Sequence, residues 1–90
     1  MTPLPEQVAG VVVAYHPDLP ALGKLLRAAR PQLAALVVID NTPAAAVAPI
    51  PAIAGVEHVS RGFNLGLAAG LNQGCEWARA RGARYVLMFD

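Results

Sequence analysis

The stretch VAGVVVAY, Val8 to Tyr15, is a short apolar run rich in valine, and His16-Pro17 ends it. Its length and its β-branched residues favour a strand buried on both faces over a helix. LVVI at Leu36–Ile39 and YVLMF at Tyr85–Phe89 have the same character, and a shorter strand is predicted at Val56–Val59. Strands that are apolar on both faces are typical of a parallel sheet covered by helices on its two sides.

Two amphipathic segments alternate with these strands. The first begins after Asp18, a residue type that caps helices, and continues with leucines at helical spacing up to Pro31. The second helix is predicted over Leu65–Arg81, with Asn64 as its N-cap and Gly82 just after its last turn. Its predicted apolar stripe consists of Leu67, Ala68, Leu71, Cys75 and Ala78. The Ala/Pro-rich stretch 42–55 is predicted to be a loop.

The resulting β-α-β-loop-β-α-β order predicts an α/β fold, a three-layer Rossmann-like parallel sheet with strand order 3-2-1-4. Ligands of such sheets bind beyond the carboxyl ends of the strands, where the winding reverses. The residues predicted at that edge are Tyr15, His16, Asp40, Asn41, Ser60–Asn64 and Asp90. An aspartate after a buried strand also commonly caps a turn, so a structural role for Asp40 and Asp90 stays open.

Composition excludes several classes of protein. Ninety residues, 56% hydrophobic and 14% charged, predict one folded domain over 1–90 and exclude intrinsic disorder. A net charge of +1 excludes a strongly basic nucleic-acid-binding surface, and a single cysteine excludes a disulfide framework or a multi-cysteine zinc site. The Rossmann glycine motif, the P-loop and the hydrolase nucleophile motif are all absent from the sequence. The first residues do not resemble a secretory signal, so a cytoplasmic protein is expected.

The second helix contains glycine at every fourth position, Gly66, Gly70 and Gly74. Each glycine inside a helix costs about 1 kcal/mol relative to alanine, so a compensating interaction is expected. Two interpretations remain open. The glycines could allow the helix to pack closely on the sheet, or the helix N-terminus could face a phosphate group.

Four segments, in their order along the chain, resemble the start of family 2 glycosyltransferases and most of all the bacterial rhamnosyltransferase branch. They are VVVAYHPD at 11–18, VVIDNT at 37–42, RGFNLGLAAGLNQG at 61–74 and YVLMFD at 85–90. The most specific of them is NLGLAAGLNQG, Asn64–Gly74. The resemblance covers nearly the whole chain except the Ala/Pro loop.

The resemblance implies the N-terminal half of a GT-A fold and a nucleotide-sugar donor, dTDP-L-rhamnose in the rhamnosyltransferase branch or a related dTDP- or UDP-sugar. In this family Ala14 and Tyr15 would line the nucleobase, and Asp40 would accept a hydrogen bond from the pyrimidine imide N–H. Asp90 would begin the acidic motif that holds a divalent metal, Mg²⁺ or Mn²⁺, on the diphosphate. The nucleotide-sugar-binding residues implied in this way are Ala14, Tyr15, Asp40, Asn41, Asn64, Gly66 and Asp90.

The resemblance also implies that the second metal-binding acid, the catalytic base and the acceptor-binding half follow Asp90. We therefore expect a fragment without catalytic residues that is inactive alone. The full enzyme would transfer the sugar to a glycan or lipid-linked acceptor in polysaccharide synthesis, in the cytoplasm or at the inner face of the membrane. Because its last strand would be an exposed edge, the fragment is expected to form a homodimer. The alternative function is a flavodoxin-like binding or regulatory module without catalysis.

Overall fold

The computed structural model describes residues 5–89. They contain one four-stranded sheet, whose strands are all parallel and lie in the order β3-β2-β1-β4. The strands are β1 (Val8–Ala14), β2 (Ala35–Pro43), β3 (Val56–Gly62) and β4 (Tyr85–Phe89). The helices are α1 (Leu19–Ala29) and α2 (Leu67–Ala80), with short 3-10 helices η1 (Pro5–Gln7) and η2 (Arg30–Gln32). The predicted α/β fold and strand order are confirmed.

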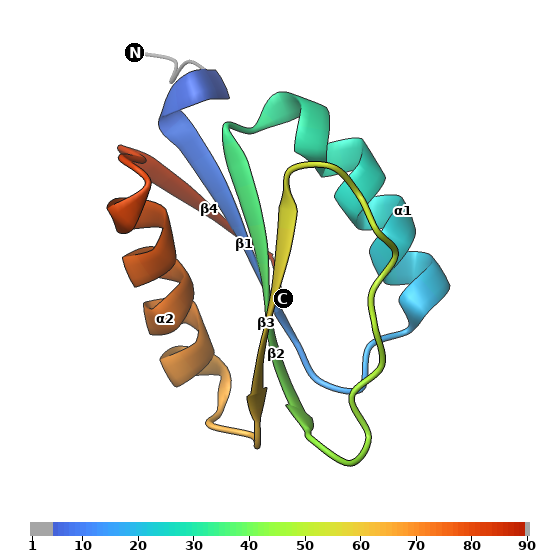
Figure 1. The fold of residues 1–90 in the computed structure, drawn as a ribbon. Coiled ribbons are helices and arrows are strands. Elements are labelled where there is room, and N and C mark those ends of the chain that lie inside the picture. The colour runs from blue at the N-terminus through green and yellow to red at the C-terminus, as the bar shows by residue number, and fades with distance from the viewer. Residues whose placement is uncertain (1–4, 90) are drawn as a thin grey trace.

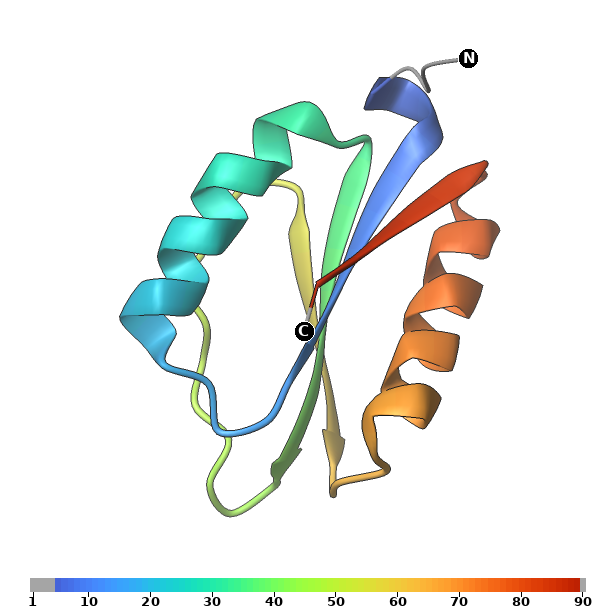
Figure 2. The same cartoon turned by 180° about the vertical axis from the view of Figure 1, so that it is seen from behind.

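The molecule has three layers, with the sheet in the middle. Helix α2 covers one face of the sheet, whereas α1 and the connection 44–55 cover the other (Figures 1 and 2). Both helices begin at the end of the molecule where β1, β2 and β3 finish, at the bottom of Figure 1. Since the chain continues from β1 to β2 and β3 on one side and returns to β4 on the other, the winding reverses between β1 and β4, as predicted.

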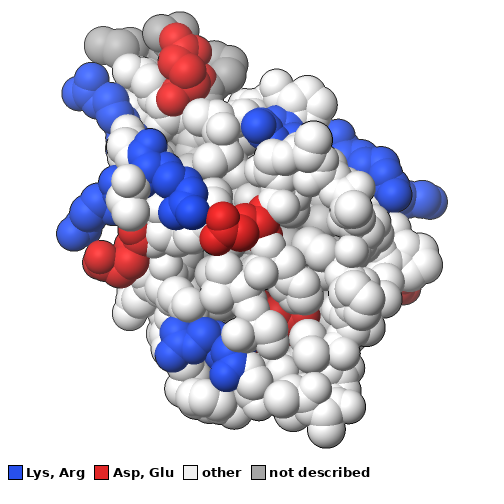
Figure 3. Space-filling view, viewed as in Figure 1, with Lys and Arg blue, Asp and Glu red and all other residues white. Residues whose placement is uncertain are grey.

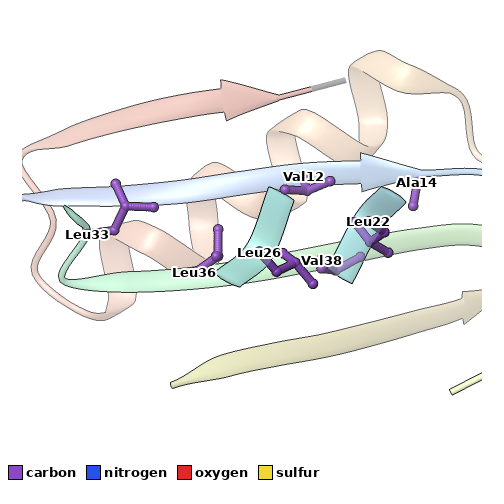
Figure 4. Close-up of a cluster of buried hydrophobic side chains, with 7 residues drawn as sticks. All are labelled: Val12, Ala14, Leu22, Leu26, Leu33, Leu36 and Val38. Atoms are coloured by element: carbon purple, nitrogen blue, oxygen red, sulfur yellow. The ribbon is translucent and has the colours of Figure 1, made fainter. Parts of the chain in front are cut away.

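The core consists of two clusters on opposite faces of β1 and β2. On the α1 side, leucines of α1 pack against alternate residues of both strands (Figure 4). That cluster contains Val12, Ala14, Leu22, Leu26, Leu33, Leu36 and Val38. On the α2 side, Val11, Val37 and Ile39 are fully buried, and Trp77 packs against them. Because both faces are buried, the two central strands need continuous apolar runs, which explains their composition.

Helix α1 begins where the sequence predicts. Asp18 is its N-cap, and the carboxylate of Asp18 accepts a hydrogen bond from the backbone N–H of Ala21 at 3.1 Å. Pro20 lies in the first turn, where its missing N–H would have had no partner inside the helix. The cap satisfies one of the backbone N–H groups of the first turn that have no partner inside the helix.

The second and third strands are longer than predicted. The predicted Leu36–Ile39 extends to Ala35–Pro43, and the predicted Val56–Val59 extends to Gly62. The reason is that Asp40, although polar, continues the ladder by pairing with Ser60, and an irregular step then leads to the pairing of Pro43 with Gly62. Polar residues that a pattern of hydrophobicity assigns to a turn therefore belong to the sheet.

The start and the buried face of α2 also differ from the prediction. The helix starts at Leu67 with Gly66 as its N-cap, and Asn64 is not the capping residue. Its buried residues are Gly70, Gly74 and Ala78, whereas Leu67 is 51% exposed. Of the predicted stripe, Ala78 is buried as expected, but Leu67 and Ala68 are exposed. The helix turns its glycines toward the sheet instead.

Candidate functional site at the carboxyl ends of the strands

The carboxyl ends of β1 and β2 bring the predicted residues into neighbouring positions. Ala14, the last residue of β1, pairs with Asp40 of β2 in the parallel register. Successive side chains of a strand point to opposite faces, so Asp40 lies on the face of α1 and Asn41 on the face of α2. The predicted site is thus divided between the two faces of the sheet.

The Asp40 carboxylate is buried and has a hydrogen-bond donor at each oxygen. Its Oδ1 accepts from the backbone N–H of Thr42 at 2.9 Å, and its Oδ2 lies 2.8 Å from Nε2 of His58 on β3. Only 1% of Asp40 is exposed. Burial acts to raise the pKa of this carboxyl, but the hydrogen bonds from Thr42 and His58 outweigh it, and the net pKa is lowered. Asp40 is therefore an ionised acceptor inside the protein.

Thr42 extends this arrangement to the end of β1. Its hydroxyl oxygen accepts a hydrogen bond from the backbone N–H of His16 at 2.8 Å, and Thr42 is buried. His16 has a φ of 46°, an uncommon conformation for a residue other than glycine. The chain thus turns sharply after β1 and is held there by β2. Neither Thr42 nor His58 was predicted as a site residue, although the pairing of His58 with Val38 puts it on the face of Asp40.

On the opposite face, Asn41, Asn64 and Gly66 do come together. The side-chain amide of Asn41 donates to the carbonyl of Gly66 at 3.0 Å, and Asn64 Oδ1 accepts from the backbone N–H of Gly66 at 2.8 Å. Asn41 is 2% exposed, and its Oδ1 has no partner. Gly66 has φ 87° and ψ 166°, a combination that is essentially restricted to glycine. These contacts fasten the turn before α2 to the end of β2.

Ala14 and Tyr15 face different surroundings. Ala14 is buried, whereas Tyr15 is 55% exposed and makes an edge-to-face contact with the ring of His16, with 4.4 Å between centroids. Both residues line a hollow of about 300 Å³ between β1 and the start of α1. An exposed aromatic ring next to a hollow is a suitable platform for a flat base.

Residues 5–89 contain no group of three or more His, Cys, Asp or Glu residues that could bind a divalent metal. Asp90, the predicted metal ligand and nucleotide-sugar-binding residue, lies outside the described residues. Asp40 does not replace it, since His58 is its neighbour and the two residues belong to no group of three or more possible ligands within residues 5–89. The described part of the chain therefore does not by itself fit a metal.

Charged side chains of both signs lie on the face seen in Figure 3, and the lower end of that face, near the carboxyl ends of β2 and β3, is mostly uncharged.

Two arginines connect α2 to the edge strand β3. Near the carboxyl end of β3, Arg61 donates a hydrogen bond to the side-chain oxygen of Gln73 on α2. At the opposite end of β3, Arg81 lies 3.1 Å from Glu57 and stacks on Trp77 at 3.9 Å. Arg61 and Arg81 thus fasten α2 to the edge strand β3 at both of its ends.

The glycines of α2 support the packing interpretation. A Cβ on Gly70 would lie 2.9 Å from a methyl group of Val13 and 3.3 Å from the amide nitrogen of Asn41. A Cβ on Gly74 would overlap the side chain of Val11. Close approach of α2 to β1 is therefore the compensating interaction for these two residues. Gly66 differs, because no atom lies within 4 Å of its added Cβ.

Comparison with known protein families decides the class. The model of glycosyl transferase family 2 matches residues 11–90. This chain belongs to glycosyl transferase family 2. Membership establishes a glycosyltransferase, with a nucleotide-sugar donor and an acceptor, and does not favour the flavodoxin-like module.

No curated protein and no solved structure gave a significant match to the chain. None of the helices in residues 5–89 has the length and the apolar character needed to cross a membrane.

Proposed function

We propose that residues 1–90 form the N-terminal nucleotide-binding part of a family 2 glycosyltransferase that uses dTDP-L-rhamnose. The observation that carries the proposal is the buried, ionised carboxylate of Asp40 at the carboxyl end of β2. An ionised acceptor makes hydrogen bonds roughly twice as strong as a neutral one, which suits the imide N–H of thymine or uracil. The acceptor substrate is a hydroxyl of a glycan or of a lipid-linked sugar in polysaccharide synthesis.

The other predicted residues would complete the donor site. Tyr15 offers an exposed ring beside the hollow at the end of β1, and Ala14 leaves room there because its side chain is small. Asn41 and Asn64 hold the turn at Gly66 in place, at the end where α2 begins. Because Asp40 is only 1% exposed, a base that reaches it must displace part of the surrounding protein.

The transfer itself would use groups outside the described residues. Asp90 would contribute to a Mg²⁺ or Mn²⁺ site on the diphosphate, and the catalytic base and the acceptor site would belong to sequence after Asp90. Residues 1–90 alone would then bind the nucleotide weakly and lack transferase activity. The enzyme would work in the cytoplasm or at the inner face of the membrane, where nucleotide sugars are available.

Calorimetric titration with dTDP and UDP, with and without Mg²⁺ or Mn²⁺, tests the proposal. Asp40→Ala should weaken binding by on the order of 1.5–3 kcal/mol, because a hydrogen bond to a charged group is lost. Glu76→Ala is the matched control, since it removes one negative charge from an exposed position on α2. Unchanged nucleotide affinity in folded Asp40→Ala would show that the role given to Asp40 is wrong.

A further inference from the structure

The imidazole of His58 contacts Oδ2 of Asp40, the carboxylate oxygen that receives no hydrogen bond from β2. Thr42 belongs to the same strand as Asp40, and its backbone N–H binds Oδ1. His58 reaches across from β3 and contacts Oδ2 at 2.8 Å. An ionised carboxylate can only accept hydrogen bonds, so Nε2 of His58 carries the proton in this contact.

Two donors from different strands fix the plane of the carboxylate. The last torsion of an aspartate side chain is broad, so a single hydrogen bond leaves the plane free to rotate. The position of His58 is itself set by the parallel register, in which His58 pairs with Val38 and Ser60 pairs with Asp40. The side chain of His58 is 21% exposed and lines a hollow of about 450 Å³ next to the connection 49–54. The imidazole can therefore be replaced without opening the closed core.

We infer that His58 is a positioning residue, which fixes the Asp40 carboxylate and thereby makes the site prefer uracil or thymine over cytosine. The inference rests on the proposed role of Asp40 as the acceptor for the base. Uracil and thymine present an imide N–H at N3, whereas cytosine has an acceptor there and a donor only at its amino group. A carboxylate of fixed orientation meets the imide donor and repels the cytosine N3. A carboxylate that rotates freely can also accept from the cytosine amino group, and the preference is then lost.

The test compares the affinities for UDP and CDP, which differ only in the base. Calorimetry should show that the unaltered protein binds UDP more tightly than CDP. His58→Ala should lower the ratio of the UDP affinity to the CDP affinity about tenfold, as expected for a lost hydrogen bond to a charged group. His58→Gln keeps an N–H donor and should keep most of the ratio. Val56→Ala is the matched control, because Val56 lies on the same face of β3 and lines the same hollow. It should leave the ratio unchanged, whereas a general loss of packing would weaken both nucleotides equally.

A second measurement needs no substitution. The ring-nitrogen NMR signals of His58 should show a protonated Nε2, and they should shift more on addition of UDP than of CDP. Equal affinity for UDP and CDP in the unaltered protein would overturn the proposed role of Asp40 and this inference with it. A preference for UDP that survives in His58→Ala, or His58 signals that respond equally to both nucleotides, would overturn the inference alone.

Discussion

Gly74 on α2 lies directly against Val11 on β1, so closely that a Cβ on Gly74 would overlap the Val11 side chain. Val11 is completely buried and β-branched, so it has little freedom to move aside. The absence of one side chain therefore sets the distance between α2 and the sheet. Since α2 begins beside Asn41, the same contact also sets how α2 approaches the site edge.

Gly74→Ala should destabilise the fold, although alanine is the better helix former. The propensity gain is about 1 kcal/mol, whereas forcing a methyl group into a packed core costs about 1–3 kcal/mol. We expect a net loss of stability in urea unfolding. The double variant Val11→Ala with Gly74→Ala should be more stable than the sum of the single effects predicts, because the overlap is relieved. Strict additivity would contradict the contact.

Because of Asp40, the free energy of unfolding should decrease as the pH falls into the acid range. Its pKa in the folded protein is lowered by the Thr42 and His58 hydrogen bonds. The stabilisation is thus fully present above the ordinary aspartate pKa of about 3.9 and is lost as pH falls through the lower folded value. Asp40→Asn should cost about 1–3 kcal/mol at pH 7 and less at pH 3, measured by urea unfolding at both values. A cost that is the same at both pH values would show that the charge of Asp40 contributes nothing.

Gly66→Ala should destabilise the turn before α2 for a reason other than crowding. No atom lies within 4 Å of the added Cβ, but the backbone has φ 87° and ψ 166°. An L-residue in that region costs on the order of 1–3 kcal/mol. Hydrogen exchange of the first turn of α2 should accelerate in Gly66→Ala and less in Asn64→Ala, which removes one exposed hydrogen bond. Unchanged exchange in Gly66→Ala would mean that the turn adopts another conformation at no cost.

The strands and both helices could be predicted because their signals are local, and the strand order followed from their alternation and from the right-handed crossover rule. The apolar run at β1 and the cap at Asp18 depend only on neighbouring residues, and both occur as predicted. The face of α2 could not be predicted in this way. A search for an apolar stripe selects large side chains such as Leu67, whereas a helix that packs closely buries Gly70 and Gly74.

The surroundings of Asp40 depend on long-range register. The sequence placed Asp40 and Asn41 at the site edge, but it did not identify His58 as the partner of Asp40. The alignment of β2 with β3 decides which residue of β3 lies beside Asp40. This alignment is set across the connection 44–55, and no short sequence motif predicts it. The functional roles of Ala14, Tyr15, Asp40, Asn41, Asn64, Gly66 and Asp90 remain predictions.

Strand β4 should cause the 90-residue chain to self-associate. It is an edge of the sheet in residues 5–89, and its residues Leu87 and Met88 are 48% and 50% exposed. An apolar edge with free backbone N–H and C=O groups pairs readily with another strand. A two-fold dimer that pairs β4 with its own copy must do so in antiparallel orientation, because the symmetry reverses the strand.

Sedimentation at tens of micromolar should therefore detect a dimer, and Leu87→Lys should shift it toward monomer, because a charge on an edge strand opposes pairing. Leu67→Lys is the matched control, since Leu67 is similarly exposed, at 51%, but lies on α2. It should leave the dimer intact if association depends on β4 and not on apolar surface in general. A monomeric unaltered chain whose β4 amides nevertheless exchange slowly would rule out edge pairing.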